Sequence, residues 1–280
     1  DIPERPGSAK AHRIIEGNDN MSKPSFLGAT SPFLVDMIMA RRPVEIEGHI
    51  RTGIQEGADA FGLQMEELMP EYRNEKALRS LFSYLADRPL YLTNYRSGCN
   101  QDRLDDGQRM DELKVAIRCG ATLVDLTADT FAPASFELTR DAAAIDRQRK
   151  VIDEFHDLGG EVLMSSHVLE FRRPEEVLEI ALEQQRRGAD IVKIVTFSGS
   201  EGELESNFDA LRLLRHELSV PFLFLSNGPF CRLHRTLGPY FGSCMWLCVD
   251  AYTELSSRNQ PLLRSMVAVV RNLDYKANRI

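Results

Sequence analysis

Short apolar segments alternate with longer amphipathic segments along most of this 280-residue chain. The apolar segments are rich in β-branched and aromatic residues, which is typical of buried strands, and the amphipathic segments have the spacing of helices that pack one face on a core. The pattern predicts strands at Ser25–Ala29, Ala58–Gln64, Leu90–Tyr95, Thr122–Thr127, Glu161–His167, Ile191–Phe197, Pro221–Ser226 and Ser243–Val249.

The segments between these strands predict helices at Glu45–Glu56, Glu75–Ala86, Arg109–Cys119, Asp141–Leu158, Pro174–Gly188, Glu203–Glu217 and Gly228–Leu237, with a last helix after Gln260. Several of them end in glycine. In Arg186-Arg187-Gly188, for example, a basic last turn precedes a glycine, which is a common helix end.

Eight strands that are each followed by a helix predict an α/β fold of the (β/α)8 TIM-barrel type, and the length suits such a barrel as a single domain over residues 21–280. Residues 1–20 are polar and rich in Gly, Pro and Asn, so we expect a leader or flexible arm there. A doubly wound open sheet is the alternative fold. No GxGxxG or GxxxxGK[ST] motif opens a helix, which removes the usual basis for a nucleotide-binding sheet of that kind.

Charge and composition narrow the possible partners. Lys and Arg number 34 against 42 Asp and Glu, a net charge of −8, which disfavours binding to a phosphate backbone. No apolar run approaches the ~20 residues of a membrane span, and no secretory signal opens the chain, so we expect a cytoplasmic protein with neither nucleic acid nor membrane as partner. The five cysteines form no CxxC pair, and we expect no disulfide framework, no metal site and no cofactor.

Two residues at predicted strand ends suggest covalent chemistry. Lys193 lies within the apolar run Ile191–Val195, and parallel barrel strands are buried on both faces. Desolvation there would lower the pKa of the amine and prepare it to form a Schiff base. His167 ends the preceding strand, about 4.8 Å away, where an imidazole could exchange a proton with the same ligand. The alternatives are a lysine that extends to water or pairs with a carboxylate, and a histidine held by structural hydrogen bonds.

Several segments resemble one family, the type I 3-dehydroquinate dehydratases, which are (β/α)8 barrels that use a lysine imine. VLMSSH is similar to the family's strand ending in histidine, and GADIVKIV to the strand that bears its lysine. LSNGPFCRLHRTLGPYFGS resembles the later stretch with the family's arginine, and Ser256–Gln260 falls at the family's Ser-Ala-Pro-Gly-Gln. The similarity runs in order from about residue 25 to residue 273.

The resemblance implies a role for each matching residue. Lys193 would form the iminium with a substrate ketone, and His167 would remove a proton from the neighbouring carbon and return it to the departing hydroxyl. Arg235 would bind the substrate carboxylate, with Ser256 and Gln260 closing over it. Asp125 would orient the ring of His167. Arg96, Gln64 and Asn100 fall at positions that bind substrate hydroxyls.

The chain departs from the family at that hydroxyl-binding edge. Gly62 and Gln64 stand where the family has Glu-x-Arg, and Asn100 replaces a glutamate. His234 replaces a serine and Asn227 a methionine. Each lost hydrogen bond to a charged group is worth roughly 1.5 to 3 kcal/mol, enough together to change the substrate or lower its turnover by powers of ten. Polar replacements in the vacated space would indicate a related polyol, and an apolar filling would indicate a less hydroxylated compound.

The leading hypothesis is therefore a hydro-lyase that removes water from 3-dehydroquinate or a related cyclic β-hydroxy ketone carboxylate through Lys193 and His167. Its partner would be a small carboxylated ketone, and the resemblance implies a possible homodimer. Two alternatives stay open: a ligand-binding or regulatory relative that has lost turnover, and a class I aldolase acting on another keto acid.

Overall fold

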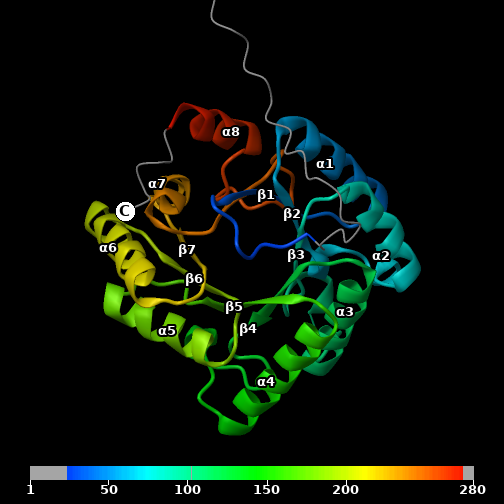
Figure 1. Ribbon diagram of the computed structural model, residues 1–280, viewed down its shortest axis with the longest axis horizontal. Coiled ribbons are helices and arrows are strands. Elements are labelled where there is room, and N and C mark those ends of the chain that lie inside the picture. Colours follow the sequence, from blue (N-terminus) through cyan, green and yellow to red (C-terminus); the bar gives the residue numbers. More distant parts are fainter. Residues whose placement is uncertain (1–23, 102, 274–280) are drawn as a thin grey trace, which may run out of the picture.

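The computed structural model describes residues 24–101 and 103–273, which form a barrel of parallel strands (Figure 1). The strands are β1 (Phe33–Ile38), β2 (Ala60–Gln64), β3 (Leu90–Thr93), β4 (Leu123–Thr127), β5 (Glu161–His167), β6 (Ile191–Phe197), β7 (Phe222–Asn227) and β8 (Met245–Cys248). They pair in the order β7-β6-β5-β4-β3-β2-β1-β8. The backbone N–H of Cys244 donates to the carbonyl of Phe222 at 2.8 Å, which nearly closes the ring between β8 and β7. The prediction for residues 1–20 lies outside the described residues.

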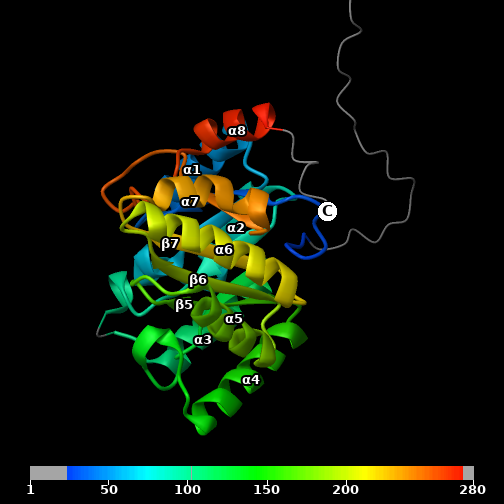
Figure 2. The ribbon, with the colours of Figure 1, turned by 90° about the vertical axis from the view of Figure 1, so that its left-hand side faces the viewer.

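Helices follow the strands and surround the barrel, as Figure 1 shows. They are α1 (Pro43–Glu56), α2 (Glu75–Phe82), α3 (Asp106–Cys119), α4 (Ala142–Asp157), α5 (Pro174–Arg186), α6 (Glu201–Glu217), α7 (Cys231–Leu237) and α8 (Leu263–Asn272). In the side view of Figure 2, α5, α6 and α7 lie over β6 and β7. The predicted (β/α)8 barrel is confirmed, and the open-sheet alternative is wrong. Among the described residues, no helix has the length and apolar character needed to cross a bilayer.

The first strand is the one element that the sequence pattern misplaced. The predicted strand at Ser25–Ala29 is wrong, because this segment is irregular and β1 begins at Phe33 instead. Phe26 is buried in the same cluster as Val35, and its N–H donates to Glu161 at the start of β5 at 3.0 Å. The segment therefore closes the end of the barrel where the strands begin. β1 escaped notice because Asp36 interrupts its apolar run.

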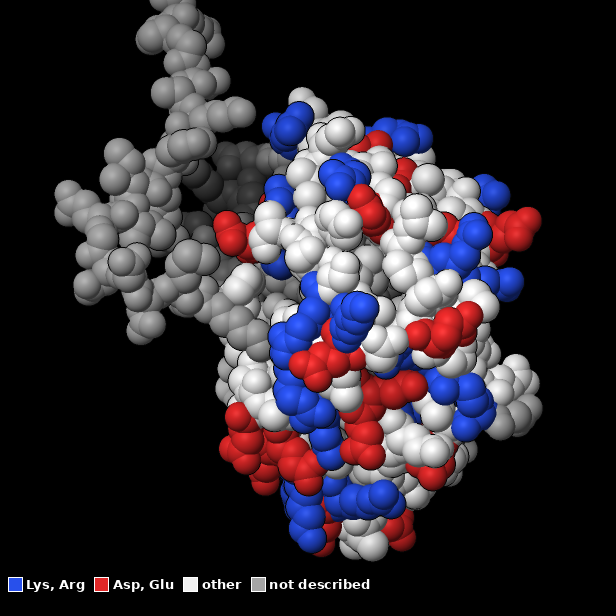
Figure 3. Space-filling model, turned by 90° about the vertical axis from the view of Figure 1, so that its right-hand side faces the viewer, with Lys and Arg blue, Asp and Glu red and all other residues white. Residues whose placement is uncertain are grey.

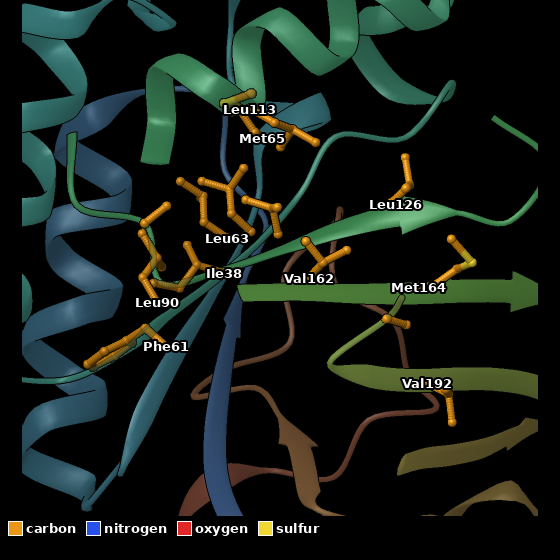
Figure 4. Packing of buried hydrophobic residues seen from close by; sticks show 14 of the residues in the cluster. Ile38, Phe61, Leu63, Met65, Leu90, Leu113, Leu126, Val162, Met164 and Val192 are labelled. Carbon is orange, nitrogen blue, oxygen red and sulfur yellow. The ribbon is translucent and has the colours of Figure 1, made fainter. Parts of the chain in front are cut away.

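Each strand divides its side chains between two apolar clusters. The outer cluster packs between strands and helices and includes Phe61, Met164 and Val192 (Figure 4). The inner cluster fills the barrel and includes Leu163, Ile191 and Leu223 among others. Because side chains alternate along a strand, the inward position of Ile191 also fixes an inward position for Lys193 two residues later. This alternation decides which polar residues can reach the interior.

Charges of both signs intermingle on the face formed by the first helices. Figure 3 shows this face, with blue and red side chains interspersed and no broad patch of one sign. Ion pairs along the helices account for part of the pattern, such as Arg51 with Glu47 on α1 and Arg79 with Glu75 on α2, both at 2.8 Å. Such a face does not suit a phosphate backbone, which needs clustered cations.

Asp36 places a carboxyl group in the outer core. Its side chain points from β1 toward α1, where a Cβ on Gly53 would lie 2.4 Å from its Oδ2, so only glycine fits there. Neither oxygen makes a well-formed hydrogen bond with a described residue. Burial, reinforced by the negative charge of Asp250, raises the pKa of Asp36 to about 8. The group is therefore held largely in its neutral form near pH 7.

We expect Asp36→Asn to stabilise the fold increasingly as pH rises from about 4 to 8. The pKa is raised on folding from 3.8 to about 8, so the unfolded chain loses this proton first and each pH unit in that window costs up to about 1.4 kcal/mol of stability. The asparagine variant carries no such penalty. Urea unfolding at several pH values measures the difference, with Asp146→Asn as an exposed control. A constant difference across the window would contradict the expectation.

Candidate active site

A cavity of about 140 Å³ opens where the strands end, at the face where barrel enzymes carry their active sites. Side chains of most strands and of the loop after β8 line it: Met37, Gln64, Tyr91, Thr93, Tyr95, His167, Lys193, Val195, Leu225, Asn227, Arg235, Leu247, Ser257 and Gln260. It brings together five of the site residues predicted from the sequence, which are Lys193, His167, Arg235, Gln64 and Gln260.

The amine of Lys193 lies inside the barrel among three oxygen atoms. Its Nζ donates to the hydroxyl of Tyr95 at 2.6 Å, to that of Tyr91 at 3.1 Å and to Oδ2 of Asp125 at 3.1 Å. The residue is only 4% exposed. The lysine thus pairs with a carboxylate, as the alternative interpretation proposed, but it does so within the cavity rather than at the surface.

Asp125 on β4 is the counter-ion of this site. Its Oδ2 also accepts hydrogen bonds from Tyr91 and Tyr95, and its Oδ1 accepts one from Ser165. Burial opposes its ionisation, but the charge of Lys193, with that of His167 and the hydrogen bonds, holds its pKa below the ordinary value. Burial and the negative charge of Asp125 raise the pKa of both tyrosines well above 10. The phenols are therefore neutral at any physiological pH.

His167 is oriented by Glu137 and not by Asp125. Oε2 of Glu137 lies 2.7 Å from Nδ1 of His167 and accepts the backbone N–H of the same residue at 3.0 Å. Burial by itself would raise the pKa of Glu137. The hydrogen bond from His167 and the charge of that ring outweigh burial and lower the pKa of this carboxyl group below its usual value. Phe136 and Glu137 both have positive φ, 60° and 47°, a conformation that costs non-glycine residues energy and often occurs at functional sites.

Arg235 on α7 presents a buried guanidinium to the cavity. It donates to the carbonyl of Ser226 at 2.9 Å and to Oδ1 of Asn227 at 3.2 Å, and it forms no ion pair with a described carboxylate. Burial lowers the pKa of Arg235 to about 10. The neighbouring His234 is buried against Ser226, and burial lowers its pKa to about 3, so it adds no charge. A guanidinium without its own counter-ion suits an anionic ligand.

The loop after β8 reaches the cavity through Ser257 and Gln260 rather than Ser256. Ser256 forms a turn with Thr253, accepting the N–H of that residue at 2.7 Å. Ser257 and Gln260 line the cavity, and the buried Oε1 of Gln260 has no hydrogen-bond partner among the described residues. This oxygen is thus available to a hydrogen-bond donor on a ligand.

Arg96 and Asn100 do not line the cavity. Arg96 pairs with Asp106 at 2.7 Å and with Asp129 at 2.8 Å, and Asn100 bonds Asn94 and the carbonyl of Tyr95. Arg96 points away from the cavity because side chains alternate along an extended chain. Tyr91, Thr93 and Tyr95 point inward, so the residue after Tyr95 faces the other way. Tyr95 takes the inward place that the sequence comparison gave to Arg96.

The edge expected to bind hydroxyls holds few groups that are still free. A Cβ on Gly62 would lie 2.1 Å from Sδ of Met37, so the thioether occupies the space where a longer side chain would stand. Thr93 already bonds Glu66, at 2.9 Å to its Oε2. The two phenols are engaged by Asp125 and Lys193. Of the polar side chains at this edge, only Gln64 makes no side-chain hydrogen bond to a described residue.

Sequence reasoning missed five residues that shape the site: Met37, Tyr91, Tyr95, Glu137 and Ser257. The tyrosines could have been found, because their spacing of four along a strand places them on one face with Thr93. Met37 was hidden with the misplaced first strand. Glu137 lies in an irregular loop 30 residues before His167, and no local pattern links them.

Comparisons with known proteins agree with this architecture. A sequence model of the family described as type I 3-dehydroquinase matches residues 37–273. A 3-dehydroquinate dehydratase of Geobacillus sp. (strain WCH70) is 31% identical over 102 residues, which are 36% of this chain and 38% of that protein. The matched segment therefore spans well under half of that relative.

Solved structures extend the similarity of fold to almost the whole barrel. A type I 3-dehydroquinate dehydratase from Clostridium difficile, with covalently modified comenic acid, gives a TM-score of 0.74 at 19% identity and covers 89% of this chain and 95% of its own. The 3-dehydroquinate dehydratase of Geobacillus kaustophilus HTA426 gives 0.73 at 17% identity, with 88% and 94% covered. Since the family model spans most of the described barrel and the site residues lie within it, the chain belongs to the type I 3-dehydroquinase family.

Proposed function

We propose that the protein is a hydro-lyase that eliminates water from a cyclic β-hydroxy ketone carboxylate through an imine on Lys193. The observation that carries the proposal is the shared cavity, in which an interior amine, an imidazole and a guanidinium free of protein carboxylates face one small volume. A ketone, an acidic carbon and a carboxylate on one ring would use all three groups. 3-Dehydroquinate is such a compound, and it is the substrate named for the relatives.

The reaction follows from these groups in order. Nζ of Lys193 adds to the ketone and water leaves, which gives an iminium beside the carboxylate of Asp125. The iminium draws electrons from the adjacent carbon, and His167 takes the proton released there. Because Glu137 engages Nδ1, the other ring nitrogen is the one available to the substrate. The electron pair then expels the β-hydroxyl, which leaves as water with the proton from His167, and hydrolysis frees the lysine.

The free polar groups favour a substrate with fewer hydroxyls than 3-dehydroquinate. Arg235, Ser257 and Gln260 provide a carboxylate site, but the opposite edge offers Met37 and one uncommitted amide, Gln64. A hydroxyl that loses water and finds no partner costs roughly 1 to 3 kcal/mol. The apolar filling of the Gly62 position thus supports a related ring that lacks vicinal hydroxyls.

We expect borohydride to trap a covalent adduct on Lys193 when the protein is mixed with 1-hydroxy-3-oxocyclohexane-1-carboxylate. Lys193→Arg keeps the positive charge beside Asp125 but cannot form the imine, and Lys193→Ala removes the amine altogether, so both should show no adduct by intact-protein mass spectrometry. Lys150→Ala, on the exposed face of α4, is the control and should be trapped like the wild type. Absence of an adduct with this compound and with 3-dehydroquinate in the wild-type protein would end the proposal.

Replacing the guanidinium should weaken carboxylate binding selectively. Loss of a charge-assisted hydrogen bond is worth roughly 1.5 to 3 kcal/mol, so Arg235→Gln should lower kcat/KM about 10- to 150-fold. Trapping of cyclohexanone, which has no carboxylate, should change little in the same variant. Arg212→Gln on the outer face of α6 serves as the control for charge loss. Equal losses with both ketones would mean that Arg235 supports the fold rather than the ligand.

The edge of the cavity formed by Met37, Gln64 and Thr93 leads to a separate prediction about substrate specificity. A site built to bond a substrate hydroxyl rejects the analogue lacking it by a factor of about 10⁴ or more. Here we expect kcat/KM for 1-hydroxy-3-oxocyclohexane-1-carboxylate to equal or exceed that for 3-dehydroquinate, as followed by the absorbance of the enone product. A preference for 3-dehydroquinate by several powers of ten would contradict the assignment of this edge. Stabilisation by either compound without product would instead favour the ligand-binding alternative.

A further inference from the structure

We propose that Tyr95 is a catalytic residue of imine formation, carrying protons between Lys193 and Asp125. The inference rests on the proposed function, since it concerns the step in which Lys193 adds to a ketone. The feature that prompts it is the position of one phenol oxygen between the two members of the ion pair. Nζ of Lys193 donates to this oxygen at 2.6 Å, and its own proton goes to Oδ2 of Asp125 at 2.6 Å.

This arrangement addresses a difficulty of the resting site. An ammonium has no lone pair and must lose a proton before it can attack a ketone, and this one is buried with its counter-ion. The direct contact from Nζ to Asp125 is 3.1 Å, whereas each half of the path through Tyr95 measures 2.6 Å. The shorter contacts make the phenol the better route for the proton.

The protons and charges balance along this route. The ammonium proton passes to the oxygen of Tyr95 as the phenolic proton passes to Asp125, which leaves a neutral amine and a neutral carboxyl group. The amine adds to the ketone carbon, the C=O bond opens, and a proton from nitrogen ends on the new hydroxyl of the carbinolamine. Asp125 then returns its proton through Tyr95 to that hydroxyl, which departs as water while nitrogen forms the C=N bond. An iminium and a carboxylate remain, and no other reactant is consumed.

The phenol suits a relay because it stays neutral. Burial and the charge of Asp125 keep the pKa of Tyr95 well above 10, so the group can give one proton only as it receives another. It also lies where the substrate must arrive. Tyr95 lines the cavity, and the edge of its ring meets the ring of His167 with 5.1 Å between centroids. The hydroxyl of a carbinolamine on Lys193 would therefore form beside this phenol.

Tyr91 provides a matched comparison within the same site. It also lines the cavity and donates to the same oxygen of Asp125, but its hydroxyl accepts from the amine of Lys193 at 3.1 Å rather than 2.6 Å, and its side chain is fully buried in the inner cluster. Among the described residues, the tyrosine ring that meets His167 is that of Tyr95. We infer that Tyr91 positions the ion pair from below and that Tyr95 exchanges protons with the reacting atoms.

The experiment isolates the imine step with 3-oxocyclohexane-1-carboxylate, which has the ketone and the carboxylate but no β-hydroxyl to eliminate. Borohydride quenching over time gives both the rate and the final extent of imine formation. We expect Tyr95→Phe to slow the rate roughly a hundredfold, the usual size of one acid–base contribution, while the final extent at saturation stays high. Tyr91→Phe should lose less. Tyr84→Phe, which alters a phenol at the outer surface near α2, should behave like the wild type.

A second readout separates proton transfer from positioning. Imidazole added at constant pH and ionic strength should accelerate Tyr95→Phe in proportion to its concentration, because an external acid and base replace the missing phenol. The wild-type protein and Tyr91→Phe should not respond. An unslowed Tyr95→Phe overturns the proposal, and so does a slow variant that ignores imidazole, since Tyr95 would then only hold Lys193 in place. Failure of the wild-type protein to be trapped at all would instead reject the imine function itself.

Discussion

The buried ion pair between Lys193 and Asp125 is the interaction around which the interior of this barrel is arranged. Taking both charges out of water costs several kcal/mol per ion, and mutual attraction offsets that cost only if the remaining hydrogen-bonding capacity is filled. Tyr91 on β3, Tyr95 just beyond the end of β3 and Ser165 on β5 fill it. The strands β3 to β6 therefore have to keep their registers for the pair to be tolerated. The same requirement keeps the amine in one place, which a covalent reaction needs.

The surroundings of the pair differ below and above the amine. Below the amine, Leu163, Ile191 and Leu223 exclude water from the barrel, so the field of Asp125 acts at low dielectric. Above it, the cavity remains open to the loop that carries Ser257 and Gln260. A ketone entering from the loop side meets the nitrogen before it meets the carboxylate. In the reaction that we propose, the iminium would keep the positive charge where the ammonium had it, so Asp125 would not have to move.

Sequence patterns predicted what depends on local periodicity and failed where distant segments meet. Lys193 could be placed inside the barrel, because it shares a face with Ile191 and Val195 and the residues on either side of it in the strand are apolar. The direction of Arg96 could not, since its prediction came from alignment with a family rather than from the alternation that Tyr95 obeys. The partner of His167 was out of reach for another reason. Glu137 comes from an irregular loop with three left-handed residues, Phe131, Phe136 and Glu137 itself, and no periodicity describes such a path.

The changes at the hydroxyl edge are easier to understand together than one by one. A Cβ at position 62 would collide with the thioether of Met37, so a glutamate there would need Met37 to move. Once the thioether and the two phenols occupy the wall, a charged group there would be buried without compensation. Arg235, at the opposite end, is the group that we propose pairs with an anionic ligand, because its described partners are a carbonyl and an amide oxygen. If the proposed function is right, substitutions at this edge can alter the hydroxyl pattern of the substrate while the amine, the imidazole and the guanidinium stay in place. The groups proposed for the chemistry and those proposed for the specificity lie in different parts of the cavity, and so the two are physically separable.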